Sequence, residues 1–386
     1  MEMQERLDRA RQLEPGIEQM RAEMDERAGM TDAAVAALRE SGVLRAAVPP
    51  ELGGPFLDPL EQIELVEEFS RIDGAVGWCA MIGAASSFVI GFLDDDRARH
   101  WFERDDACVA GQLQPTGRAE RVPGGYLASG RFRFGSGIGH ATVVLGGCIV
   151  TEGGAVARSP AGRPEVRTVL FDPAQCRIIE TWDTSGLRAT GSHDYEIENL
   201  FIPEGDAYDP TAPARRDEPL FRFSPLFLAT HDGVPLGIAR RAIDTAIDVV
   251  LEKGLPPMGL GDAPKLCDQV QVQDAVARAE VELGGARALC YSAVGDVWAS
   301  MQAGRRVSRR ERGMYRASMT YSHQVAKKVV GELCDAASTA AVGRDSVLDR
   351  QLRDIVTACQ HRMVHSRVYA PAGRLIMGLE SGDPTV

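Results

Sequence analysis

Residues 130–141 (Gly-Arg-Phe-Arg-Phe-Gly-Ser-Gly-Ile-Gly-His-Ala) combine polar side chains with features that a ligand site needs. Phenylalanines and arginines alternate as in a half-buried strand, and the glycines that follow remove side chains from the backbone. A flat ligand can approach such a backbone, and Ser136 and His140 are the polar side chains that the loop offers it. A plain strand end with a flexible turn explains the same pattern, so both interpretations stay open.

His361 and His365 are four residues apart, which places them on one face of a helix predicted for residues 346–367. This spacing suits metal ligands, but Arg362 stands where a zinc protease needs a glutamate, so we expect no metal site. An imidazole that lines a cavity can still donate or accept a proton near neutral pH. His361 is therefore the better candidate for chemistry, and a structural histidine is the alternative.

Residues 78–93 are apolar on almost every face, which predicts an enclosed helix that forms one wall of a ligand cavity. Ser86 and Ser87 are the hydroxyls deep in that run, and small residues tolerated in a crowded helix are the alternative interpretation. We predict a substrate pocket that includes Trp78, Ser86, Ser87 and His365.

Three regions must position these residues. Residues 1–106 have helical periodicity, residues 107–215 change to the period-two pattern of a compact antiparallel β domain, and residues 216–386 return to helices. Prolines and a glycine at 256–259 predict a break between helices of the last region. The predicted class is α+β, with an N-terminal helical domain, a central β domain and a C-terminal four-helix bundle. The four predicted helices of that bundle span 234–251, 269–301, 309–336 and 346–367.

Composition limits the possible partners. The 386 residues are 44% hydrophobic and carry a net charge of −12, and no basic cluster has interleaved aromatic residues, so we expect no nucleic-acid partner. We find no apolar run of membrane-spanning length and no apolar segment of signal-peptide type near the start, so we expect a soluble, cytoplasmic protein that does not bind membranes. The eight cysteines form no CxxC pair, which argues against zinc and disulfides.

Three blocks of the sequence resemble the acyl-CoA dehydrogenase superfold. They are residues 130–141, residues 182–192 (Trp-Asp-Thr-Ser-Gly-Leu-Arg-Ala-Thr-Gly-Ser) and residues 352–361 (Leu-Arg-Asp-Ile-Val-Thr-Ala-Cys-Gln-His). The order of helical, β and helical regions agrees with that fold along nearly the whole chain. The first and third blocks are more similar to its flavin-dependent monooxygenase branch, which comprises the oxygenase components of two-component systems.

The resemblance implies a chemistry and a set of partners. A flavin reductase supplies reduced FMN or FAD, and the oxygenase reacts it with O2 to give a C4a-hydroperoxyflavin that hydroxylates a small or medium organic substrate. Homotetramers are usual for this fold. Ser136 matches the serine that hydrogen-bonds near flavin N5, and His361 matches the histidine that steadies the hydroperoxide or handles the substrate proton.

Further flavin contacts follow from the same resemblance. The glycines near Ser136 allow the backbone to approach the ring closely, and two other segments pass the cofactor in this fold. The implied cofactor-binding residues are Gln112, Gln114, Thr116, Ser136, Gly137, Arg188, Thr190, Gly191 and Ser192.

The chain departs from family patterns in two places. Acyl-CoA dehydrogenases often place a catalytic glutamate after an aromatic residue near the C-terminus, whereas Ala370 follows Tyr369 here. Several monooxygenases carry a histidine on the helix that matches residues 78–93, and serines stand there in this chain, which leaves the substrate type open. An FAD-dependent acyl-CoA dehydrogenase-like oxidoreductase and a catalytically silent flavin-binding protein remain the alternatives.

Overall fold

The computed structural model describes residues 2–255, 265–383 and 386. The chain forms two compact units, each assembled from several stretches. What we call the sheet unit contains Met1–Asp58, Trp78–Thr184 and Arg188–Phe227. What we call the helical unit contains Pro59–Gly77, Ser185–Leu187 and Leu228–Val386. The break predicted at 256–259 lies outside the described residues.

The sheet unit holds short helices and one sheet, and the predicted order of helices, strands and helices is confirmed. Its helices are α1 (Met3–Gln12), α2 (Glu14–Glu26), α3 (Asp32–Ser41) and α6 (Asp95–Phe102). Its strands are β1 (Val109–Val122), β2 (Gly125–Gly135), β3 (Val143–Glu152), β4 (Ala155–Val156), β5 (Val166–Phe171), β6 (Arg177–Ile179), β7 (His193–Pro203) and β8 (Ala207–Tyr208).

The sheet is mixed, whereas we predicted an antiparallel one. Its strand order is β6-β7-β2-β1-β3-β5-β8, with β4 paired to β3, and β1 and β3 run parallel. The parallel pair arises because β2 forms an antiparallel hairpin with β1, and the chain then returns on the other edge of β1. A strand that reverses β2 must run in the direction of β1.

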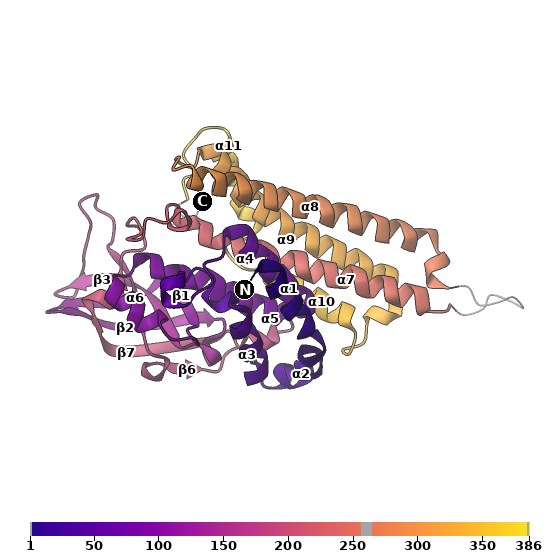
Figure 1. Ribbon diagram of the computed structural model, residues 1–386, viewed down its shortest axis with the longest axis horizontal. Coiled ribbons are helices and arrows are strands. Elements are labelled where there is room, and N and C mark those ends of the chain that lie inside the picture. The colour runs from indigo at the N-terminus through magenta and orange to yellow at the C-terminus, as the bar shows by residue number, and fades with distance from the viewer. Residues whose placement is uncertain (1, 256–264, 384–385) are drawn as a thin grey trace, which may run out of the picture. The chain divides into compact units, whose positions relative to one another are not determined.

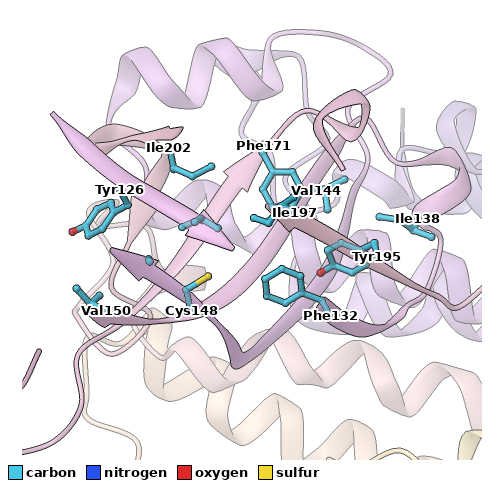
Figure 2. Close-up of a cluster of buried hydrophobic side chains, with 13 residues drawn as sticks. Tyr126, Phe132, Ile138, Val144, Cys148, Val150, Phe171, Tyr195, Ile197 and Ile202 are labelled. Atoms are coloured by element: carbon cyan, nitrogen blue, oxygen red, sulfur yellow. The ribbon is translucent and has the colours of Figure 1, made fainter. Parts of the chain in front are cut away.

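Aromatic side chains build the core of the sheet (Figure 2). Phe132 and Tyr195 stack with their ring centroids 5.1 Å apart, and both side chains are fully buried. The Tyr195 hydroxyl donates to the Leu145 carbonyl at 2.5 Å and accepts from the Gln112 amide at 2.8 Å. This hydroxyl therefore fixes β1 where its register to β3 shifts after Gln112.

The helical unit is organised around α9, which packs against α7, α8, α10 and α11 (Figure 1). Its helices are α4 (Pro59–Ile72), α7 (Gly233–Glu252), α8 (Val270–Gln302), α9 (Arg309–Ala337), α10 (Val347–Ala358) and α11 (Tyr369–Ile376). Three of the four long helices that we predicted match α7, α8 and α9 closely. The fourth is shorter than predicted, because α10 ends at Ala358 rather than at residue 367.

The apolar stretch that we predicted as one enclosed helix is α5 (Gly74–Ser87) followed by a 3-10 segment (Phe88–Phe92). Contrary to our expectation, Gly74–Phe92 is long and apolar enough to cross a membrane, with a mean hydropathy of 1.7. However, 89% of this stretch is buried inside the protein, which is typical of a core helix.

Candidate functional site

Four buried side chains of the sheet unit form a continuous line of hydrogen bonds that we call the hydroxyl chain. The Trp78 indole Nε1 donates to Ser136 Oγ at 3.1 Å, and Ser136 Oγ lies 2.7 Å from Ser192 Oγ. Ser192 Oγ in turn lies 2.7 Å from Thr190 Oγ1. The structure therefore brings together four of the predicted site residues from segments far apart in the sequence.

The backbone around Ser136 explains how its hydroxyl is held. Phe134 has a φ of 60°, so the strand alternation ends there: Phe132 is buried, but Phe134 is 55% exposed. The Ser136 amide donates to the Phe134 carbonyl at 2.9 Å, and the Gly137 amide donates to the Thr190 carbonyl at 2.9 Å. The turn after β2 is thereby tied to the segment that carries Ser192.

Residues 188–192, which carry Thr190 and Ser192 of the hydroxyl chain, are held in place on both sides of Thr190. The Arg188 Nε donates to the Asp25 carbonyl at 2.6 Å, and its Nη1 donates to Asp183 at 2.6 Å. Gly191 has a φ of 52°, and a Cβ there would lie 2.9 Å from the Ala28 carbonyl oxygen. Arg188 thus anchors this segment to α2, and its predicted contact with flavin stays a prediction.

The other predicted flavin contacts lie within β1 rather than in a loop. The Gln112 side chain donates to the Arg133 carbonyl at 3.3 Å and accepts from the Gln114 amide at 3.1 Å. Gln114 and Thr116 are exposed. These contacts with flavin stay a prediction.

Two residues of the predicted substrate pocket, Ser87 and His365, make hydrogen bonds with the backbone, and their pocket roles stay a prediction. Ser87 Oγ accepts from the Ala47 amide at 2.9 Å and donates to the Ala84 carbonyl at 2.7 Å, so the backbone uses its hydrogen-bonding capacity. His365 is exposed, and its Nδ1 accepts from the Arg367 amide at 3.2 Å as the cap of a short 3-10 turn. Ser86 is half-buried, and its pocket role stays a prediction.

The predicted pairing of His361 with His365 on one helical face is wrong. Because α10 ends at Ala358, both histidines lie in the turns that follow it. His361 instead meets His231 of the same helical unit, with ring centroids 5.1 Å apart.

His231, His323 and His361 form what we call the histidine cluster. Burial and, to a smaller extent, the positive charge of Arg316 lower the pKa of His361 to about 4. Burial also lowers the pKa of His323 to about 4 and holds the pKa of His231 well below its ordinary value. The three imidazoles are therefore neutral at pH 7.

The tautomers of two of these histidines follow from their partners. His231 Nδ1 lies 3.1 Å from the Leu228 carbonyl oxygen, and His323 Nδ1 lies 2.8 Å from the Met319 carbonyl oxygen. Since a carbonyl only accepts, we assign the proton to Nδ1 in both rings, which leaves each Nε2 as an acceptor. Sequence reasoning missed both residues, because neither has a spacing that marks a site.

The described residues also include potential metal ligands. Within the described part of the chain, no group of three or more histidine, cysteine, aspartate or glutamate side chains is arranged to hold a metal ion.

Comparison with known proteins agrees with the fold. The N-terminal domain of acyl-CoA dehydrogenases matches residues 4–102, and their C-terminal domain matches residues 229–366. An indole-3-acetate monooxygenase of Pseudomonas putida is 30% identical over 92% of this chain and 89% of that protein. The oxygenase component of an FADH(2)-dependent resorcinol hydroxylase of Rhizobium sp. is 27% identical over 90% of this chain and 87% of that protein.

A solved structure extends the likeness to three dimensions. XiaF from Streptomyces sp., in complex with FADH2 and glycerol, superposes with a TM-score of 0.89 at 20% sequence identity, covering 100% of this chain and 98% of that one. Fold and sequence together define a flavoenzyme of the acyl-CoA dehydrogenase family, and this chain belongs to that family. Within it, the chain is a flavin-dependent monooxygenase, not a dehydrogenase.

Proposed function

We propose that this chain is the oxygenase component that takes reduced FMN or FAD from a separate flavin reductase and hydroxylates an aromatic or heteroaromatic substrate. Bound reduced flavin supplies two electrons, so that one atom of O2 enters the substrate and the other leaves as water. The observation that carries the proposal is the hydroxyl chain of Trp78, Ser136, Ser192 and Thr190. Indole-3-acetate and resorcinol, named for two relatives, are both ring compounds.

The residues present fit a flavin ring. Hydroxyl groups both donate and accept, which suits a ring system that carries N–H groups, ring nitrogens and carbonyl oxygens. Ser136, Thr190 and Ser192 would hold the ring, and the Gly137 backbone carries no side chain that would keep it away. Because the Trp78 N–H occupies one acceptor position of Ser136, the serine proton points to Ser192 or to the ligand.

His361 supplies a different function. A neutral imidazole accepts a hydrogen bond or a proton from an N–H or O–H group of a substrate, and the lowered pKa keeps this ring neutral. By contrast, Tyr369 stands near the position of the dehydrogenase base, is partly exposed and donates to Gln324 Oε1 at 3.1 Å. The dehydrogenase alternative therefore lacks its base here.

We also propose a homotetramer in the cytoplasm, on the strength of the family's usual assembly. Light scattering of the purified protein measures the assembly directly, and a monomer at micromolar concentration would contradict it.

The test supplies the protein with FMN or FAD that has been reduced anaerobically, then adds 18O2 and a ring substrate such as indole-3-acetate or resorcinol. We expect one 18O atom in the product and little hydrogen peroxide. The same mixture without protein is the control, because free reduced flavin converts O2 to peroxide. Peroxide as the sole product with both flavins and across a broad panel of ring compounds would contradict the proposal.

Ser136→Ala tests the site. Loss of a buried hydroxyl that serves the cofactor should lower the ratio of product to peroxide by about tenfold, since ~1.4 kcal/mol corresponds to that factor. Ser129→Ala is the matched control, because Ser129 lies on the same strand and its hydroxyl accepts from the Asn199 amide at 2.8 Å, away from the hydroxyl chain. An unchanged product ratio in Ser136→Ala would remove Ser136 from the site.

A further inference from the structure

Among the described residues, Arg316 on α9 is a buried cation without an ion pair. Its side chain is 1% exposed, although a guanidinium stays charged in proteins. Its Nη1 donates to the Met319 sulfur at 3.2 Å and its Nη2 donates to the Met363 carbonyl at 2.9 Å. Among the described residues, its Nε has no hydrogen-bond partner and no carboxylate oxygen lies within 4.0 Å of its nitrogens.

Other buried arginines of this chain are satisfied differently. Arg45 donates to the Leu52 and Phe102 carbonyls at 2.5 and 2.8 Å, and it lies 3.5 Å from Asp105. Arg350 lies 3.0 Å from Asp73. Since a buried charge is costly unless it is paired, the state of Arg316 requires a reason beyond packing.

Two acids, Asp232 and Asp383, act electrostatically on Arg316 without forming an ion pair with it among the described residues, and the hydrogen bonds of Asp232 are with other groups. Asp232 Oδ1 accepts from Ser322 Oγ at 2.9 Å and from the Cys290 thiol at 3.2 Å. Burial raises the pKa of Asp232 to about 6, although Arg316 acts against this rise. Asp232 therefore accepts hydrogen bonds from uncharged donors and forms no ion pair with Arg316.

We propose that Arg316 is a positioning residue for His361: it ties residues 359–365 to α9 and places an unpaired positive charge beside the imidazole. The inference rests on the role proposed above for His361. Met363, whose carbonyl Arg316 holds, lies two residues after His361, in the stretch between α10 and the turn capped by His365. A second hydrogen bond to α9 is donated by the Cys359 thiol to the His323 carbonyl at 3.3 Å.

The charge has a consequence for the chemistry of His361. A neighbouring cation opposes protonation of an imidazole, and Arg316 is the charged group that adds to burial in lowering the pKa of His361. The other titratable groups around His361 are His231 and His323, and burial is the main cause that lowers their pKa values. Arg316 therefore adds to burial in holding His361 in the form that accepts a proton or a hydrogen bond from the substrate.

Two variants of Arg316 separate its charge from its packing. Arg316→Gln removes the charge and keeps hydrogen-bond donors, whereas Arg316→Lys keeps the charge. The pKa of each histidine can be followed by hydrogen–deuterium exchange at the imidazole carbon, read by peptide mass spectrometry on the full protein without flavin or substrate. We expect the pKa of His361 to rise by about one unit or more in Arg316→Gln, a tenfold gain in proton affinity, and to stay near the wild-type value in Arg316→Lys.

Activity provides a second readout. In Arg316→Gln, the acidic limb of the pH profile for product formed per flavin oxidised should shift to higher pH, and rescue by Arg316→Lys should restore it. The affinity for oxidised FMN or FAD, measured by flavin fluorescence, should change less than twofold, because a positioning role for His361 does not act on flavin binding. The wild-type level of secondary structure by circular dichroism is the folding control.

Several outcomes overturn the inference. An identical His361 titration in wild type and Arg316→Gln contradicts it, and so does a wild-type His361 that titrates near its ordinary value of about 6.5. The second measurement needs no variant, so misfolding of Arg316→Gln does not remove the test. Because the exchange measurement needs no turnover, a chain that hydroxylates nothing would contradict the proposed function but not this inference.

Discussion

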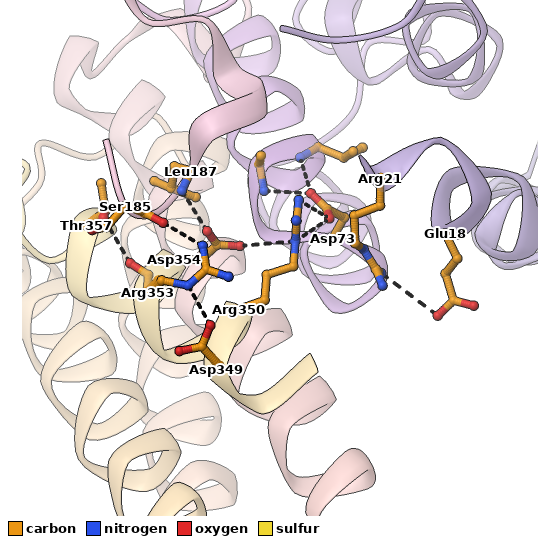
Figure 3. A network of polar contacts seen from close by, with 12 residues as sticks. Glu18, Arg21, Asp73, Ser185, Leu187, Asp349, Arg350, Arg353, Asp354 and Thr357 are labelled. Atoms are coloured by element: carbon orange, nitrogen blue, oxygen red, sulfur yellow. Dashed lines mark hydrogen bonds and ion pairs between the residues drawn. The ribbon is translucent and has the colours of Figure 1, made fainter. Parts of the chain in front are cut away.

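Two buried arginines of the helical unit differ in what surrounds them. Arg350 lies 3.0 Å from Asp73 and 4.0 Å from Asp354, so one cation faces two carboxylates (Figure 3). Arg316 acts electrostatically on His361 and His231, which are neutral, and has no ion pair within the described residues. Burial alone therefore does not define the role of a charge: the first arginine holds structure together, and the second acts on the protonation of its neighbours.

The acids around Arg350 hold backbone as well as charge. Asp73 Oδ1 accepts from the Ala75 and Val76 amides at 2.9 and 3.2 Å, at the start of α5. Asp354 Oδ1 accepts from the Leu187 amide at 2.6 Å. Leu187 has a φ of 52°, and the chain continues from it into the segment that carries Thr190 and Ser192. Asp354 thus fixes the backbone at Leu187.

The largest effect should come from breaking the ion pair. Asp73→Ala leaves Arg350 buried beside one acid and removes the start of α5, so we expect a loss of about 3–5 kcal/mol in the free energy of unfolding. Arg316→Met breaks no ion pair among the described residues and should cost about 1–2 kcal/mol, because it removes two hydrogen bonds. Urea denaturation of both variants measures the difference, and equal losses would end the distinction between the two arginines.

The sequence predicts those helices of the helical unit whose apolar residues repeat regularly. Helical periodicity located α7, α8 and α9, because long amphipathic helices repeat their pattern over many turns. It failed at His361, because α10 ends without a glycine or proline in the residues that follow Ala358. The predicted helical face shared by His361 and His365 is therefore wrong, and Asp354, which lies within α10, belongs to the cluster of Arg350.

The contacts that define the site are long-range and had no local signal. Ser136 and Ser192 were predicted by resemblance, but the hydrogen bond from Trp78 to Ser136 joins residues 58 positions apart. Arg316 differs from Arg45 and Arg350 in being buried without a carboxylate within 4.0 Å among the described residues, and this depends on the packing of separate helices. Such properties of a site require the folded structure.

A smaller effect should follow from loosening the hold on Leu187. Asp354→Ala leaves a buried amide without an acceptor and should cost about 1–3 kcal/mol, whereas Asp354→Asn keeps an oxygen acceptor and should cost less. Hydrogen exchange of residues 185–192 should accelerate in the alanine variant and stay near wild type in the asparagine variant. Flavin affinity should fall in the same order. Equal protection of this segment in both variants would show that Asp354 does not hold it.

The smallest net effect, and the sharpest contrast, concerns pH. His323 and His361 have pKa values of about 4 in the folded chain, below the ordinary value of about 6.5. Between these two values the unfolded chain binds more protons than the folded chain, so the free energy of unfolding falls as pH falls. Burial and the charge of Asp73 raise the pKa of Asp354 to about 7, so the folded chain binds more protons above pH 4 and stability falls as pH rises toward 7.

The lowered pKa values of His231, His323 and His361 make stability rise with pH between about pH 4 and 6.5, whereas the raised pKa values of Asp232 and Asp354 make it fall. Wild type should therefore show a shallower dependence of stability on pH than the histidines alone would give. Asp354→Asn removes one of the contributions that fall with rising pH, and its stability should therefore rise more steeply from pH 4.5 to 6.5 than that of wild type. Arg316→Gln weakens the histidine contribution and should give a slope shallower than wild type, or reversed. Urea midpoints at half-unit pH steps measure all three slopes. If the stability curves of all three proteins run parallel, neither arginine environment controls protonation. The two variants should change the slope in opposite directions, because the acid and the histidines contribute to it with opposite signs.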